Sequence, residues 1–170
     1  DNSSLLKKTY VSKFMFPLAK ITSSLVDCLF SLGAFLIVII FTRSPFYWTM
    51  LLFPFIFLQA YIFACGLGFF LAQLHVFFRD TRYIWNAITT AWMYCSAIFY
   101  PIDMLPDWLK LLVNYFNPLY VYIKQFRCIA HQGVMPDLTT IGLGFLYAFL
   151  FFGLGVLCFK KNQDKFILYI

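Results

Sequence analysis

The side chains able to do chemistry in this chain are few and far apart. Its 170 residues include seven acids, all of them Asp, and two histidines, His75 and His131. A His-Glu-x-x-His zinc site is excluded because Glu is absent, and a pair of catalytic carboxylates could come only from the seven Asp residues. A Ser-His-Asp arrangement could use only Ser44, His131 and Asp103 or Asp107, and no nucleophile-elbow motif supports it. The sequence therefore indicates no catalytic residue and no metal site.

Motifs for cofactors and nucleic acid are missing as well. There is no Gly-x-x-x-x-Gly-Lys phosphate loop, and Gly66-Leu67-Gly68 lies in an apolar run without the third glycine of a dinucleotide fingerprint. The five cysteines stand alone, without a Cys-x-x-Cys pair, so neither a disulfide framework nor a zinc site is indicated. The net charge of +6 is spread in small groups between uncharged runs, which argues against nucleic acid as a partner.

The clearest polar pattern lies in an apolar stretch after Arg82. A stripe of aromatic and hydroxyl residues there follows helical spacing and consists of Trp85, Thr89, Trp92, Ser96 and Phe99, with Tyr100 beside it. Aromatic rings can stack on the apolar faces of sugars, and hydroxyls can bond to sugar hydroxyls, so this face could line a path for sugars. Packing of helices through hydrogen bonds explains the pattern equally well.

A membrane is the medium that must position these side chains. The chain is 62% hydrophobic and 12% charged, whereas soluble domains are about 25% charged. We expect an all-α polytopic membrane helix bundle that forms a single domain. A crossing helix needs about 20 apolar residues, and four stretches qualify, at about 21–42, 46–75, 83–102 and 138–159. Asp27 is the one acid inside a predicted span.

Lysine and arginine indicate the orientation of the spans. The N-terminal stretch, the loop after the second span and the tail hold nine of these residues, against four in the remaining loops. Because cytoplasmic loops are enriched in Lys and Arg, both ends of the chain are expected in the cytoplasm. Residues 5–17 form a basic amphipathic pattern, which indicates either a helix on the cytoplasmic membrane surface or a docking helix for a soluble partner.

Residues 103–135 are too apolar for an exposed loop and are divided by Pro106 and Pro118. Asn117-Pro118 is typical of an N-cap followed by proline at the first helical position. We expect two short re-entrant helices on the outer face, and one amphipathic helix lying flat on the membrane is the alternative. In the second span, small residues recur every four positions and predict close helix packing: Ala60, Ala64, Gly68 and Ala72.

Several segments, in this order, resemble the type-2 ABC exporter permeases, most closely the branch that exports O-antigen, capsule and teichoic-acid polymers. Val76-Phe77-Phe78-Arg79-Asp80 is similar to the family's "fRD" motif, and Lys13–Pro17 to its "k-x-x-f-P". Ser96–Pro101 resembles its "s-P-I-f-Y-p" segment, although Ala97 stands where the family often has proline. Asn117-Pro118, followed by Arg127, resembles its "N-P…R" segment. These permeases have six spans, so the chain is expected to be a C-terminal fragment with four.

The resemblance implies a permease subunit of the cytoplasmic membrane that moves lipid-linked polysaccharide outward. It would pair with a second copy of itself and with a separate ABC ATPase, which would hold ATP and Mg²⁺. The implied ATPase-coupling residues are Lys7, Lys8, Lys13, Phe14 and Pro17, the implied cytoplasmic gate is Arg79 and Asp80, and the stripe from Trp85 to Tyr100 would line the path. The alternatives are a type-2 permease for a drug or lipid, a membrane-embedded transferase, and an assembly protein without cargo.

Overall fold

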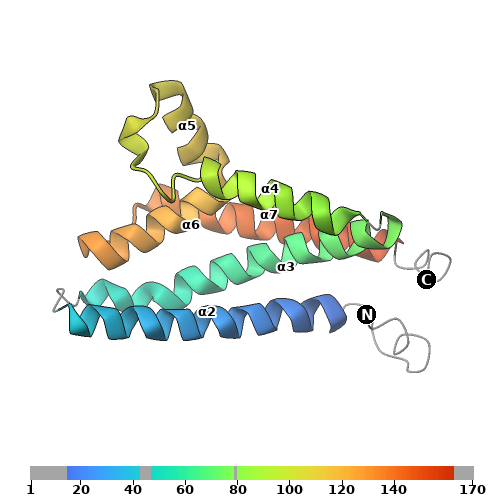
Figure 1. The fold of residues 1–170 in the computed structure, drawn as a ribbon, viewed down its shortest axis with the longest axis horizontal. Helices are drawn as coiled ribbons and strands as arrows, with labels where there is room; N and C mark the ends of the chain where they lie inside the picture. Colours follow the sequence, from blue (N-terminus) through green and yellow to red (C-terminus); the bar gives the residue numbers. More distant parts are fainter. Residues whose placement is uncertain (1–14, 43–46, 79, 163–170) are drawn as a thin grey trace.

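The fold is all-α, as the composition predicts. The computed structural model describes residues 15–42, 47–78 and 80–162, and every regular element within these ranges is helical (Figure 1). Long helices alternate with short ones, in the order α2 (Met15–Phe41), η1 (Trp48–Leu52), α3 (Phe53–Phe77), α4 (Thr81–Cys95), η2 (Ile102–Met104), α5 (Asp107–Phe116), α6 (Pro118–Arg127), η3 (Cys128–Gln132) and α7 (Leu138–Asn162).

In the described part of the chain three helices are long and apolar enough to cross a membrane, which indicates a multi-pass membrane protein. The qualifying segments are Pro17–Phe41, Trp48–His75 and Leu138–Lys161. At about 1.5 Å per residue they exceed the roughly 30 Å of a hydrocarbon core. They coincide with the first, second and fourth expected spans. The second changes from the 3-10 helix η1 to the α-helix α3 at Phe53, one residue before Pro54.

The third expected span, 83–102, differs from the structure. Helix α4 has 15 residues and ends at Cys95, so it is about 22 Å long. Ser96 ends it locally, because its hydroxyl bonds back to the Trp92 carbonyl at 2.7 Å. Ala97 then takes a left-handed φ of 49°, which terminates a helix. Among the described residues three helices, not four, meet the criteria for a span, so the four-span count stays a prediction.

The first expected span also starts earlier than predicted. Helix α2 begins at Met15 rather than at about residue 21, and Pro17 lies in its first turn. Proline is tolerated there because the first N–H groups of a helix have no intrahelical acceptor. Pro17 therefore belongs to the spanning helix instead of closing a separate helix over 5–17. Residues 5–14 of that predicted coupling helix lie outside the described residues.

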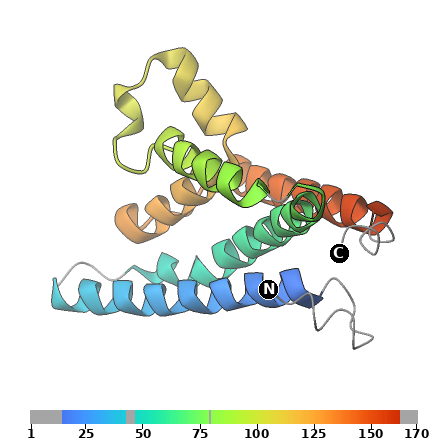
Figure 2. The same ribbon diagram turned by 45° about the vertical axis from the view of Figure 1, so that its right-hand side comes forward.

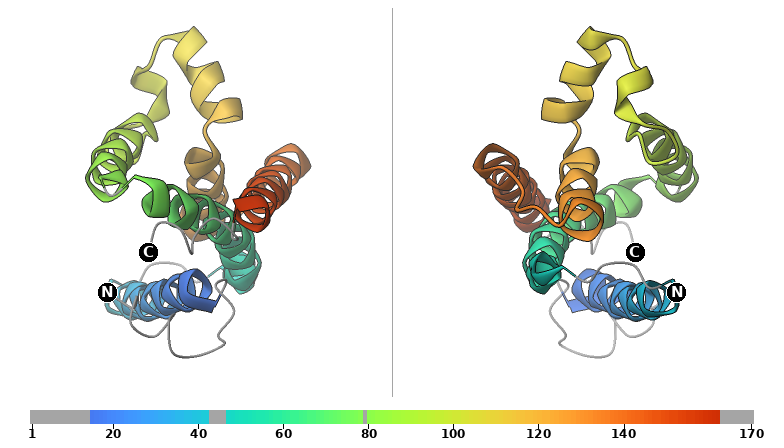
Figure 3. Two further views of the ribbon diagram at one scale, coloured as in Figure 1. Left: turned by 90° about the vertical axis from the view of Figure 1, so that its right-hand side faces the viewer. Right: turned by 90° about the vertical axis from the view of Figure 1, so that its left-hand side faces the viewer.

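Helix α3 is the centre of the bundle and touches α2, α4, α6 and α7 (Figure 3). Its crossing with α7 depends on two glycines. A methyl group on Gly66 would overlap the backbone of Phe151 and Phe152, and one on Gly155 would overlap the backbone of Gly66. The two helices therefore meet backbone to backbone, the kind of approach that small residues permit in lipid.

The small residues singled out in the sequence do pack, with one exception. Gly68 lies against the Ile21 side chain of α2, Ala60 packs in the α3–α6–α7 core and Ala72 in a second cluster around Phe159. Ala64 is exposed. The predicted stripe is thus a packing surface at three positions of four, and the closest crossing lies beside it at Gly66.

Helix α5 rises from the bundle in an arch that η2 joins to α4, and α6 follows α5 and packs against α3 and α7 (Figure 2). They start after Pro106 and at Pro118, as the sequence predicts. Each has 10 residues, about 15 Å of helix, too short to span. Whether they re-enter the membrane or lie along its surface stays a prediction.

The two ends of the bundle differ. The start of α2, the connection from α3 to α4 and the end of α7 lie at one end (Figure 1). At the other end, Ile39, Met50, Phe53 and Ile129 form a buried cluster. The segments that the Lys and Arg pattern assigns to the cytoplasm therefore share one end of the fold, and the orientation of that end in the membrane stays a prediction.

Candidate translocation site

Helix α4 presents the predicted aromatic and hydroxyl stripe only in part. The helix has no buried residue, and Thr89 and Phe99 are exposed. Trp85 and Trp92 are half-buried and meet edge to face with ring centroids 6.4 Å apart. Ser96, in contrast, is fully buried. The stripe therefore divides into an exposed section and an inner section that packs against other helices. The exposed section is compatible with a path for sugars, and the inner section with helix packing.

The inner section is organised by Asn117. Its side-chain oxygen accepts a hydrogen bond from Trp92 Nε1 at 2.9 Å. Its amide nitrogen donates to Ser96 Oγ at 3.0 Å and to the Cys95 carbonyl at 3.4 Å. The same oxygen caps α6 by accepting the backbone N–H groups of Leu119 and Tyr120. One side chain thus joins the end of α4 to the start of α6, and we call this cluster the Asn117 hub.

Arg127 secures the turn that follows the hub. Its guanidinium donates to the carbonyls of Ala97 and Ile98 at 2.9 and 3.1 Å. The left-handed φ of Ala97 is one that the proline ring forbids. The chain therefore differs from the family's frequent proline at a position where this turn could not hold one. Three segments of the resemblance, Ser96–Pro101, Asn117-Pro118 and Arg127, meet in this region.

A buried polar seam holds α6 between α3 and α7. Gln125 donates to the side chain of Gln59 at 3.2 Å and to the Thr140 carbonyl at 3.1 Å, and both glutamines are fully buried. Tyr122 donates to the Gly144 carbonyl at 2.9 Å, and burial raises the pKa of its phenol, which keeps the donor protonated. Sequence reasoning missed this seam. Gln59, an amide inside an apolar run, was the available signal.

The predicted coupling and gate residues are described only in part. Lys7, Lys8, Lys13 and Phe14 lie outside the described residues, and so does Arg79. Asp80 is exposed and stands at the N-cap of α4 without a side-chain cap bond. Pro17 is half-buried at the start of α2. Pro17 lies in the first turn of α2 and Asp80 at the N-cap of α4, and these two helix starts lie at the same end of the bundle (Figure 1). The predicted roles of the two residues stay predictions.

Metal and acid chemistry have no gathered site in the described part of the chain. No group of three or more His, Cys, Asp or Glu residues lies close enough there to hold an ion. The salt bridge found in these ranges joins Lys110 and Asp107 within α5. Asp27 is exposed on α2 and forms no salt bridge with a described residue.

Three apolar helices, an arch of short helices and a partly exposed aromatic and hydroxyl face define a polytopic membrane protein with the features of a permease. The chain belongs to the ABC-2 type transporter family, whose model matches residues 3–131. No solved structure matches the chain.

Three curated relatives of the chain are O-antigen export permeases. The chain is 25% identical over 139 residues to an O-antigen export system permease protein RfbA of Myxococcus xanthus, covering 81% of this chain and 53% of the relative. Two proteins of the same name from Klebsiella pneumoniae are 25% and 22% identical, and each alignment covers 97% of this chain and 63% of the relative. The chain thus spans less than two thirds of the length of these relatives.

Proposed function

We propose that this chain is the transmembrane permease subunit of an ATP-driven exporter that moves lipid-linked polysaccharide, such as O-antigen, across the cytoplasmic membrane. The alignment of O-antigen export permeases with 97% of the chain is the observation that carries the proposal. The exposed hydroxyl and aromatic side chains of the stripe, such as Thr89 on α4 and Phe99 beyond the end of α4, suit a sugar polymer better than an apolar drug. Both ends of the chain would lie in the cytoplasm.

A second copy of the chain and an ATPase would complete the proposed exporter. Helix α4 has no buried residue within one copy, so a partner copy facing it would enclose the stripe between two subunits. ATP and Mg²⁺ would be held by the ATPase, because this chain has no phosphate loop. The permease itself would need no cofactor.

Deletion of the gene tests this function directly. We expect the deletion strain to lose surface polysaccharide and to accumulate lipid-linked polymer inside the cell, and a plasmid copy to restore export. Surface polymer is read by antibody binding to intact cells, and internal polymer by the same antibody after lysis. If the deletion strain keeps its surface polymer and becomes sensitive to small hydrophobic drugs, the polysaccharide proposal is wrong and a drug permease is favoured.

Arg79→Ala is expected to reduce export while the protein still inserts into the membrane. Removal of one charge-assisted interaction at a gate corresponds to a loss of roughly tenfold in rate. The measurement is surface polymer per unit of membrane-inserted protein, and Arg79→Lys is the matched variant that keeps the charge. Wild-type export by a well-expressed Arg79→Ala protein would remove this residue from the gate.

Replacement of Lys7 and Lys8 by Glu is expected to weaken docking of the ATPase. Reversal of two charges at an interface should lower the affinity by about tenfold or more. The ATPase retained on tagged permease after extraction in mild detergent gives the readout. The same double reversal at Lys110 and Lys124, on the expected outer side, serves as the control, and equal retention by both variants would contradict the coupling assignment.

A further inference from the structure

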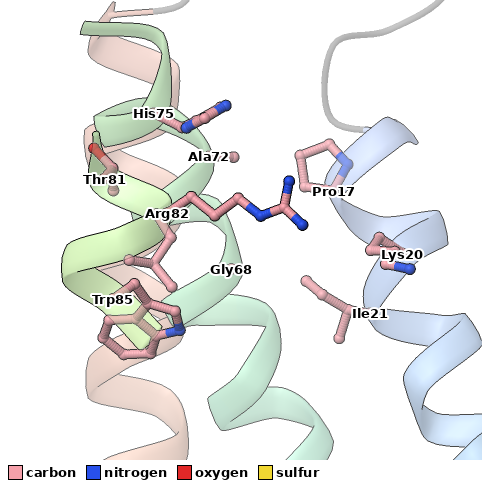
Figure 4. Close-up of a pocket in the computed structure, with 10 residues that line it drawn as sticks. Pro17, Lys20, Ile21, Gly68, Ala72, His75, Thr81, Arg82 and Trp85 are labelled. Atoms are coloured by element: carbon pink, nitrogen blue, oxygen red, sulfur yellow. The ribbon is translucent and has the colours of Figure 1, made fainter. Parts of the chain in front are cut away.

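A cavity of about 500 Å³ lies between α2, α3 and α4, at the end of the bundle assigned to the cytoplasm (Figure 4). Basic side chains from all three helices line it: Lys20 from α2, His75 from α3 and Arg82 from α4. Figure 4 shows the Arg82 side chain running from α4 across the cavity toward Pro17 and Lys20. None of these three side chains belongs to the stripe or to the Asn117 hub.

The charges in this cavity are not balanced by the described part of the protein. Its lining contains no acidic side chain, and neither Lys20 nor Arg82 forms a salt bridge with a described residue. Two cations that line one cavity beside apolar walls repel, and an anion held in that cavity would relieve the repulsion. The first turn of α4 adds the positive end of a helix dipole at Thr81 and Arg82, both of which line the cavity.

The walls change from charged to apolar with depth. Along α3, His75 lies near the helix end, Ala72 one turn deeper and Gly68 about 10 Å from His75. Along α4, Arg82 comes first and Trp85 one turn deeper, and most of the lining surface is apolar. A free anion would gain nothing from the deep part. An amphiphile with a charged head and an apolar chain matches both parts.

We propose that this cavity binds the diphosphate headgroup of a lipid, with Arg82 and Lys20 as its charged partners and the lipid chain along Trp85 and Ala72. Two permanent cations from separate helices suit a head with two or more negative charges better than the single charge of a common phospholipid. This inference rests on the proposed function. An exporter of lipid-linked polysaccharide meets the charged headgroup of its cargo lipid at its cytoplasmic end, and that headgroup is the ligand proposed here.

Direct binding of a lipid diphosphate tests the site. The permease from the complete gene, with its ATPase, is placed in phosphatidylcholine nanodiscs, and radiolabelled geranylgeranyl diphosphate is the probe. We expect Arg82→Gln and Lys20→Gln each to weaken binding by roughly tenfold. Lys161→Gln, the same charge change at the end of α7, should leave binding within about twofold of wild type. Arg82→Lys keeps the charge and should bind better than Arg82→Gln.

Competition identifies the ligand chemistry. Unlabelled geranylgeranyl diphosphate should displace the probe, whereas geranylgeraniol and inorganic pyrophosphate should do so poorly. Equal competition by pyrophosphate would make this a site for a soluble anion, and equal competition by phosphatidylglycerol would make it an ordinary lipid site; either result overturns the proposal. Wild-type affinity of correctly folded Arg82→Gln and Lys20→Gln proteins would also overturn it.

The two proposals can fail separately. Polysaccharide export in cells without specific binding of the lipid diphosphate would overturn the cavity assignment and leave the exporter intact. Specific binding in a protein whose deletion leaves surface polysaccharide unchanged would overturn the exporter and leave the cavity assigned.

Discussion

Gly155→Ala is expected to destabilise the protein, although alanine is the better helix former. Intrinsic propensity favours Ala over Gly in a helix by about 1 kcal/mol. The added methyl group, however, would overlap the backbone of Gly66 on α3. A backbone cannot rotate aside as a side chain can, so α3 and α7 must separate and lose packing along their crossing. We expect a net loss of about 2 kcal/mol or more, measured as a lower unfolding temperature in detergent.

Gly153→Ala is the matched control, two residues earlier on the same helix. A methyl group at Gly153 meets nothing within 4 Å, so only the gain in helix propensity remains. This variant should unfold at the wild-type temperature or slightly above it. The two single-methyl changes are thus predicted to have opposite signs. A Gly155→Ala protein as stable as the Gly153→Ala protein would mean that α3 and α7 do not touch at this point.

Asn117→Ala is expected to have the second large effect, because it removes every hydrogen bond of the hub. Loss of the N-cap of α6 costs about 1 kcal/mol. The indole N–H of Trp92 and the hydroxyl of Ser96 also lose a partner in a partly buried place, at about 1–3 kcal/mol. We expect a lower unfolding temperature, with the arch opening first, read as faster hydrogen exchange in residues 95–120.

Asn114→Ala is the control for the hub. Asn114 is also half-buried, but its amide bonds only to the Lys110 carbonyl of its own helix, α5. Its loss should change stability by no more than about 0.5 kcal/mol. Asn117→Asp should lie between the two, because a carboxylate keeps the acceptor for the α6 cap and for Trp92 but cannot donate to Cys95. Equal exchange rates in all three variants would show that the hub does not hold the arch.

Long-range apolar patterning made most of the helices predictable. Apolar runs of 20 or more residues with at most one charge identify α2, α3 and α7, although α2 starts earlier than predicted, because the thickness of the membrane sets the length of a crossing helix. Pro106 and Asn117-Pro118 predict where α5 and α6 begin, since both signals are local. The end of α4 was not predictable in this way. Residues 96–102 are as apolar as a span, and the turn there depends on Arg127, 30 residues away.

The sequence identified several residues of the candidate site but not how they are arranged in space. Helical spacing identified Trp85, Thr89 and Trp92 as neighbours, and all three lie on α4. The pairing of Trp92 with Asn117 joins residues 25 apart in sequence, which no periodicity encodes. The cavity around Arg82 also combines three helices, and sequence spacing cannot state which helices are neighbours. The predicted roles in coupling, gating and transport stay predictions.

The contact between Gly66 and Gly155 also couples α3 and α7, so that the two helices are expected to move as one rigid unit. Because backbone meets backbone at this point, no rotamer change there can let one helix roll or slide on the other without breaking the contact. Helix α4 has no buried residue and is fastened chiefly at its far end by the Asn117 hub. If an ATPase drives this protein, as proposed, movement is expected at α4 and not between α3 and α7.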